Sequence, residues 1–176
     1  MAEETLGCYN IFDLRDIALK RVPKGLLHPK DAKNASDCGA DSVIVSNHGG
    51  RNLDGALSPM QVLPEMLDAV GKRVTVLIDS GFRRGGDVVK ALALGAHGVQ
   101  IGRSTLYGVV AGGEVGARRA IGIIREEIDR VLALLGCRDV AELGPEFLHI
   151  EDGLFRTATA PRASIRLVES AKVATL

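Results

Sequence analysis

Three short segments rich in β-branched residues constrain the fold of this chain most strongly, because each is followed by a glycine-bearing loop and then a helical pattern. They begin at residues 42, 74 and 98 and read SVIVS, VTVLI and GVQI. The first two are almost continuously apolar, as strands covered on both faces are. Alternation of such strands with helices predicts an α/β fold with a parallel sheet.

Helical patterns occupy the segments between and after these strands. We expect helices over residues 29–38, 60–70, 87–94, 104–111 and 116–135. Ser58 and Pro59 supply an N-cap and a first-turn proline for the second helix, and Gly71 ends it. The spacing of the units is typical of a (β/α)8 barrel, but a complete barrel takes roughly 250 residues. A chain of 176 residues is therefore predicted to form a partial (β/α)8 TIM barrel with C-terminal helices.

Composition and charge exclude several functional classes. The 22 basic and 22 acidic residues balance, so no net charge draws the chain toward nucleic acid. No apolar run reaches the ~20 residues that a membrane span needs, and the acidic N-terminus does not resemble a signal peptide, so a cytoplasmic location is expected. Cys8, Cys38 and Cys137 share no metal-ligand or redox spacing. We expect reduced thiols and no metal site.

The loop after the first strand, SNHGGRNLD, carries a candidate catalytic pair. His48 and Arg51 leave the strand within one tight turn. Gly49 and Gly50 allow the backbone to approach a ligand closely. Because histidine accepts a proton and arginine binds a carboxylate with paired donors, the loop predicts a catalytic site. The alternative interpretation is a polar surface turn.

The two following loops, DSGFRRGGD and IGRST, predict a phosphate site. Each places a glycine and an arginine between the end of a strand and the start of a helix. Arg83, Arg103 and two helix N-termini would then converge on one anion. The alternative for each turn taken singly is a simple loop. Asp79 would repel a phosphate, so we expect it to accept hydrogen bonds from ligand hydroxyls instead.

Long motifs in this region resemble a known family. IVSNHGGRNLDGALSPMQVLPE, IDSGFRRGGDVVKALALGAHGVQIGRSTLYG and LLGCRDVAELGP occur in the order found in the C-terminal half of the FMN-dependent α-hydroxy-acid dehydrogenases and oxidases. The resemblance covers roughly residues 24–148 and is greatest to mandelate-oxidising members. It implies FMN as cofactor and a small 2-hydroxy acid, mandelate- or lactate-like, that is oxidised to the 2-oxo acid.

The same resemblance implies roles for individual residues. The histidine of SNHGGR is the family's catalytic base and its arginine binds the substrate carboxylate, which points to His48 and Arg51. The implied cofactor contacts are Lys24 and Ser46 at the flavin ring, Asp79, Ser80, Gly81, Phe82 and Arg83 along the ribityl chain and phosphate, and Gly102 and Arg103 at the phosphate.

The N-terminal part departs from the family pattern. CYNIFDLRDIALKRVPKG resembles the family's N-terminal helix joined directly to Lys24, which indicates an internal deletion. We therefore predict an N-terminal helical segment over 1–23, an FMN-binding half-barrel with C-terminal helices over 24–150, and an irregular tail over 151–176. The residues that cover the second flavin face are missing, so the alternative function is a catalytically inactive half-barrel that binds FMN or phosphate. Open sheet edges and uncovered apolar faces predict a homo-oligomer.

Overall fold

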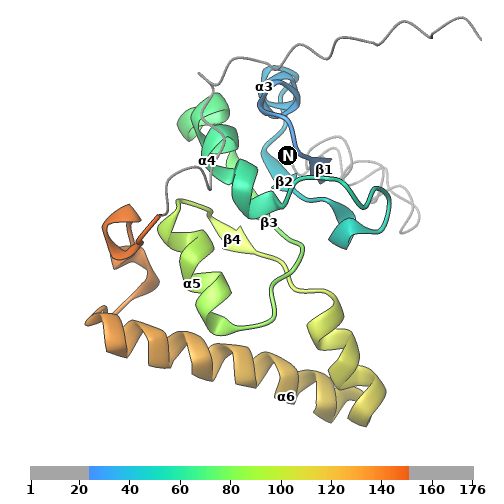
Figure 1. Cartoon of the computed structure of the whole chain (residues 1–176), viewed down its shortest axis with the longest axis vertical. Coiled ribbons are helices and arrows are strands. Elements are labelled where there is room, and N and C mark those ends of the chain that lie inside the picture. Colours follow the sequence, from blue (N-terminus) through green and yellow to red (C-terminus); the bar gives the residue numbers. More distant parts are fainter. Residues whose placement is uncertain (1–23, 151–176) are drawn as a thin grey trace, which may run out of the picture.

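The computed structural model describes residues 24–150, so the predicted segments 1–23 and 151–176 lie outside the described residues. Helices and strands alternate along this part of the chain (Figure 1). The elements are β1 (Lys24–Leu26), α3 (Pro29–Asp37), β2 (Ser42–Val45), α4 (Pro59–Val70), β3 (Thr75–Ile78), α5 (Gly85–Ala93), β4 (Gly98–Val99) and α6 (Arg103–Leu135). The strands form one parallel sheet in the order β1-β2-β3-β4. This is the arrangement expected for a sector of an α/β barrel.

The centre of the sheet is apolar on the side that packs against the helices. Val43 pairs with Val76 and Val45 with Ile78, and all four side chains are fully buried. Leu63 and Met66 of α4 belong to the same buried cluster. The near-continuous apolar runs therefore form the two central strands, as the sequence predicts.

Strand β1 is an addition to the three strands expected from the sequence. It has only three residues, Lys24–Leu26, and its register against β2 shifts between Lys24 and Leu26. A strand this short, at the edge of the sheet and containing Gly25, has no apolar run that sequence patterning can detect.

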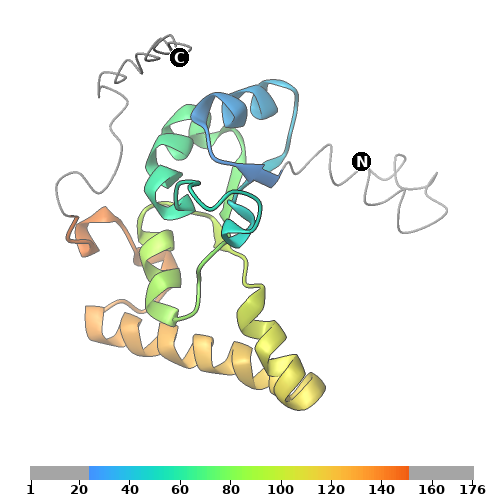
Figure 2. The same ribbon diagram turned by 45° about the vertical axis from the view of Figure 1, so that its right-hand side comes forward.

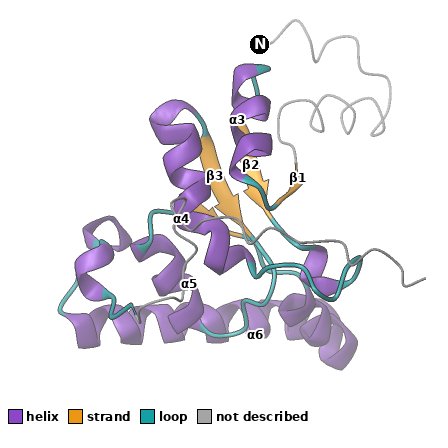
Figure 3. Ribbon diagram, turned by 45° about the horizontal axis from the view of Figure 1, so that its top comes forward, coloured by secondary structure: helices purple, strands orange, loops and turns teal. Residues whose placement is uncertain are grey.

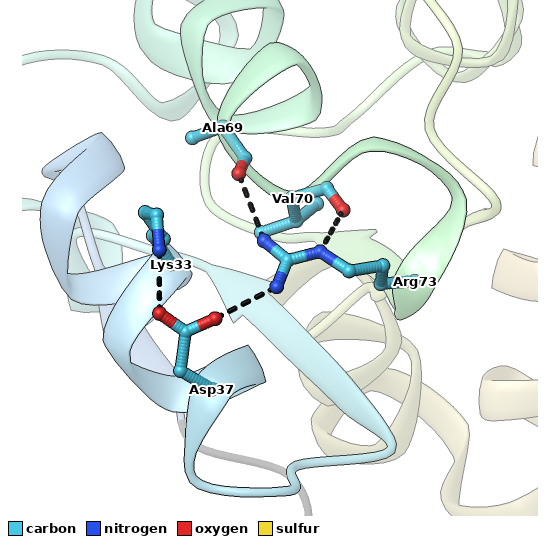
Figure 4. A network of polar contacts seen from close by, with 5 residues as sticks. All are labelled: Lys33, Asp37, Ala69, Val70 and Arg73. Carbon is cyan, nitrogen blue, oxygen red and sulfur yellow. Dashed lines mark hydrogen bonds and ion pairs between the residues drawn. The ribbon is translucent and has the colours of Figure 1, made fainter.

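Helices α3 and α4 lie side by side over the sheet (Figure 3). Arg73, just after α4, connects them: its guanidinium donates to the carbonyl oxygens of Ala69 and Val70 and lies 2.7 Å from Asp37 Oδ1 (Figure 4). Hydrogen bonds from Lys33 and Arg73 hold the pKa of Asp37 below its ordinary value. The cluster ties the ends of the two helices together at the surface.

The predicted start and end of α4 are confirmed. Pro59 is its first residue, and Ser58 N–H donates to Gln61 Oε1 at 3.1 Å, as in a capping box. Gly71 is the C-terminal cap, with a positive φ of 57°. The cap residues thus give the helix its boundaries.

Helix α6 is bent sharply within its span (Figure 2). Gly112 and Gly113 leave the helical conformation and separate an N-terminal part from a longer C-terminal part. The two parts cross where the backbones of Gly108 and Gly116 touch, a contact that leaves no room for a Cβ atom. The two helices predicted over 104–111 and 116–135 therefore correspond to the two arms of α6.

Candidate active site

A cavity of about 660 Å³ opens at the carboxyl ends of the strands. Its volume lies within the range of roughly 300–1,000 Å³ that is typical of small-molecule and cofactor sites. Ten of the residues predicted to form the site line it: Lys24, His48, Arg51, Asp79, Ser80, Gly81, Phe82, Arg83, Gly102 and Arg103. The three loops identified in the sequence therefore meet around one space.

Asp79 is engaged by the chain itself, which the sequence did not predict. Its Oδ2 lies 2.7 Å from Lys24 Nζ, and Ser80 Oγ donates to its Oδ1 at 2.6 Å. The Asp79 side chain is 13% exposed. Burial acts to raise its pKa, but hydrogen bonds from Lys24, Ser46 and Ser80 outweigh burial and hold the pKa below its ordinary value of 3.8. The expectation of a carboxylate free for ligand hydroxyls is thus incomplete, since β1 brings a cation to it.

His48 projects from a strained turn at the end of β2. Its φ of 56° is in the left-handed region, and its N–H donates to Ser46 Oγ at 3.1 Å. The imidazole lies against Gly25 of β1, where a Cβ atom would be 2.7 Å from His48 Cε1. Within residues 24–150, no hydrogen bond or ion pair engages the imidazole nitrogens. Gly25 is a site residue that the sequence analysis missed, although it directly follows Lys24.

The loop of His48 and the predicted phosphate loops are in contact. Arg103 Nη2 donates to the carbonyl oxygen of Gly49 at 3.3 Å, and Gly49 N–H donates to Ser80 Oγ at 3.1 Å. Gly49 has a φ of 71°, and a Cβ atom there would lie 2.7 Å from Arg103 Nη2. The positive φ favours glycine at this position, whereas the flexible guanidinium of Arg103 could move away from a Cβ atom.

The two helix N-termini do not converge as predicted. At the start of α5, the N–H groups of Arg83 and Arg84 donate to Asp87 Oδ2 at 3.2 and 3.1 Å, and that of Gly85 donates to Glu127 Oε2 at 2.7 Å. Carboxylates of the chain therefore already occupy this end, and the prediction is wrong for α5. Hydrogen bonds from Gly85 and Arg84 hold the pKa of Glu127 below its ordinary value.

The N-terminus of α6 does face the cavity. Gly102 and Arg103 line the cavity, and Ser104 Oγ donates to the carbonyl oxygen of Phe82 at 3.0 Å. Arg83 also lines the cavity, whereas Arg84 pairs with Glu127 at 2.9 Å. The consecutive arginines thus have different partners, and the candidate anion site consists of Arg83, Arg103 and the first turn of α6.

Two predicted cofactor contacts have buried side chains. Ser46 is 1% exposed, accepts a hydrogen bond from the His48 N–H and is not among the residues that line the cavity. Phe82 is 6% exposed and belongs to the hydrophobic core. Phe82 therefore both lines the cavity and packs in the core.

Known proteins share these sequence motifs and this fold. The family described as FMN-dependent dehydrogenase matches residues 3–150. The chain belongs to this family. Its members use FMN as cofactor, so the resemblance predicted from the motifs is confirmed.

Individual relatives match at high identity. The chain is 52% identical to (S)-mandelate dehydrogenase from Pseudomonas putida over 146 residues, which cover 82% of this chain and 36% of that protein. It is 54% identical to L-lactate dehydrogenase from Caulobacter vibrioides over 127 residues, which cover 72% of this chain and 33% of that protein. The chain thus spans about a third of the length of the curated relatives it matches.

A solved structure confirms the fold class. The crystal structure of the monotopic membrane protein (S)-mandelate dehydrogenase superposes with a TM-score of 0.71 and 52% identity, covering 74% of this chain and 34% of that one. Such neighbours are (β/α)8 barrels, so the open sheet of this chain is a partial α/β barrel. Within residues 24–150, no helix combines the length and apolar character needed to cross a bilayer. Because this neighbour is a membrane protein, the cytoplasmic location stays a prediction.

Proposed function

We propose that this chain binds FMN in the cavity at the carboxyl ends of its strands and takes part in the oxidation of a 2-hydroxy acid to the 2-oxo acid. The observation that carries the proposal is the meeting of His48 and Arg51 with the cationic groups Arg83 and Arg103 around one cavity. FMN, when bound, accepts the two electrons that the substrate loses. Membership of the FMN-dependent dehydrogenase family supports this cofactor.

The substrate side of the cavity is assigned to the loop after β2. Arg51 binds the substrate carboxylate through parallel N–H donors. A neutral imidazole nitrogen of His48 takes a proton, either from the α-carbon or from the hydroxyl group. Both routes require the substrate to be held at a fixed position relative to His48, and such positioning accounts for a large part of an enzymatic rate.

The cofactor side is assigned to the loops after β3 and β4. Arg83, Arg103 and the first turn of α6 would bind the phosphate, and Gly81, Phe82 and Gly102 line the cavity beside them. Lys24 would hold the flavin ring and its partner Asp79, 2.7 Å away, the ribityl hydroxyls. The cavity volume and the cationic groups in it fit a phosphorylated ligand of this size.

Reconstitution with FMN tests the proposal. We expect the purified chain to bind FMN and become yellow, and the colour to bleach under anaerobic conditions when a hydroxy acid is added. His48→Ala should abolish bleaching and leave FMN binding intact, because the imidazole acts on the substrate. His28→Ala is the matched control, since His28 caps α3 through its Nδ1. Bleaching that survives His48→Ala contradicts the role assigned to His48.

The same experiment separates the proposal from a catalytically inactive half-barrel. A chain that binds FMN without being bleached by any hydroxy acid supports the inactive alternative. A chain that takes up no FMN contradicts the proposed function and leaves the inactive half-barrel, binding phosphate alone, as the alternative. Glycolate, lactate and mandelate form the substrate panel, with mandelate favoured by the similarity to (S)-mandelate dehydrogenase. Oxygen and a dye as acceptors distinguish an oxidase from a dehydrogenase.

We also propose that the chain self-associates. In the described part, β1 pairs only with β2 and β4 only with β3, so both edges of the sheet are open. Large apolar side chains of α6, including Tyr107, Val110 and Val115, are more than half exposed. Open edges and apolar patches favour association. Sedimentation velocity should show a mass that rises with concentration, and a strict monomer contradicts this proposal.

A further inference from the structure

Two serine side chains connect the backbone of the His48 loop to one carboxylate. His48 N–H donates to Ser46 Oγ at 3.1 Å, and the Ser46 hydroxyl is one of the groups that lower the pKa of Asp79. Gly49 N–H donates to Ser80 Oγ at 3.1 Å, and Ser80 Oγ donates to Asp79 Oδ1 at 2.6 Å. We call the two connections, His48–Ser46–Asp79 and Gly49–Ser80–Asp79, the serine bridges.

The serine bridges depend on which groups donate and which accept. A hydroxyl group has one proton. Ser80 accepts from the Gly49 amide and gives its proton to Asp79, whereas Ser46 accepts from the His48 amide and keeps its proton for the neighbouring carboxylate. The ionised form of Asp79 is the best acceptor for these hydroxyls, and Lys24 Nζ at 2.7 Å supplies the compensating charge. The other charged or titratable groups around the cavity are His48, Arg51, Arg83 and Arg103. None of these other groups is a carboxylate that could replace Asp79.

The serine bridges act where the backbone is strained. His48 and Ser80 both have positive φ values, 56° and 75°, without being glycine. Such conformations persist only where the surroundings hold them. One bridge fixes the amide of His48 and the other the amide that follows it, so together they determine where the imidazole projects into the cavity.

We propose that Asp79, acting through Ser46 and Ser80, is a positioning residue that holds the His48 loop in its strained conformation. This deepens the proposed function, on which it rests for the role of His48. In this proposal the Ser80 hydroxyl supports the His48 loop, whereas the family resemblance implies that Ser80 contacts the cofactor directly. The inference concerns residues 46–49 and 79–80 alone and is tested without cofactor.

Amide hydrogen exchange measured by NMR on the full chain tests each bridge separately. Removing the Ser80 hydroxyl with Ser80→Gly, which suits the positive φ, should speed exchange of the Gly49 amide about ten-fold, the effect of losing one hydrogen bond. The His48 amide should change less. Ser46→Ala should give the reverse pattern. Ser104→Ala is the matched control, because its hydroxyl donates to Phe82 on another side of the cavity.

A pH titration distinguishes positioning by Asp79 from general loosening of the fold. In the wild-type chain, the amide signals of His48 and Gly49 should shift together as the Asp79 carboxyl titrates. Ser80→Gly should remove the response of Gly49 and keep that of His48. Ser80→Ala should behave in the same way, so that added glycine flexibility is not the cause.

Two results would overturn the inference. One is equal exchange of the Gly49 amide in the wild type and in both Ser80 variants. The other is an amide response to pH that persists unchanged in Asp79→Asn. Failure of the proposed function gives a different result, because the wild-type chain then takes up no FMN. The amide exchange and pH titration of the His48 loop test the serine bridges independently of that result.

Discussion

Gly25 in β1 and His48 after β2 lie so close that a Cβ atom on Gly25 would be 2.7 Å from Cε1 of the imidazole. The imidazole ring therefore occupies the space that a side chain at position 25 of the edge strand would need. Two features require glycine here, the contact and a φ of +89°.

Gly25→Ala should displace the His48 ring and destabilise the chain. The positive φ costs about 1 kcal/mol for alanine, and the contact with the ring adds roughly 1–3 kcal/mol. Denaturant unfolding measures the loss, and the NMR signal of the His48 Cε1 proton reports the displacement. Gly39→Ala is the control, because Gly39 has a φ of +86° and nothing within 4 Å of a Cβ atom. Equal losses in both variants, with an unmoved imidazole signal, would contradict the contact.

Arg103→Ala should weaken binding of FMN and of inorganic phosphate by roughly ten-fold or more, because a charge-assisted hydrogen bond is lost. Arg51→Ala should leave phosphate binding nearly unchanged, since Arg51 is assigned to the substrate carboxylate. Arg84→Ala should also have little effect, because Arg84 pairs with Glu127 rather than lining the cavity. Isothermal titration calorimetry provides the comparison. Weakening by Arg51→Ala and not by Arg103→Ala would place the anion site on the substrate side.

The ionised form of Asp79 should stabilise the folded chain above its ordinary pKa. The folded-state pKa lies below the ordinary value of 3.8, so the stabilisation is present above pH 3.8 and is lost as the pH falls through the folded-state pKa. Asp79→Asn should therefore lower stability at neutral pH and flatten its dependence on pH below 3.8. Urea unfolding at several pH values measures both effects.

Asp54→Asn is the control for this pH dependence. Asp54 is an exposed carboxylate in the loop after β2. Its replacement should leave the slope of stability against pH close to that of the wild type. If the stability of Asp79→Asn depended on pH as steeply as that of the wild type, the contacts of Asp79 would not favour its ionised form.

Local signals in the sequence were sufficient for the central fold. The apolar runs at 42 and 74 predicted β2 and β3, and Ser58, Pro59 and Gly71 predicted the limits of α4, because these features act through neighbouring residues. The loops of the candidate site could be placed as well, since parallel strands end at the same edge of a sheet.

Contacts between residues far apart in the chain could not be predicted from such local sequence signals. The pairing of Lys24 with Asp79 depends on β1, whose three residues carry no periodic pattern. The expected convergence of two helix N-termini failed because Glu127, 42 residues after Gly85, reaches the first amide of α5. Sequence spacing shows which helix ends can bind an anion, but it does not show which distant carboxylate already occupies one.

Gly108→Ala in α6 should destabilise the chain, because its Cβ atom would meet the backbone of Gly116 in the opposite arm of the bent helix. Backbone atoms cannot rotate away, so the two arms must separate, at a cost of roughly 1–3 kcal/mol or more. Gly122→Ala is the matched control in the same helix, since nothing lies within 4 Å of a Cβ atom there. Alanine is the better helix former, so Gly122→Ala should raise stability by about 0.5–1 kcal/mol. Thermal unfolding that shows both variants shifted in the same direction would mean that the arms of α6 do not cross at Gly108 and Gly116.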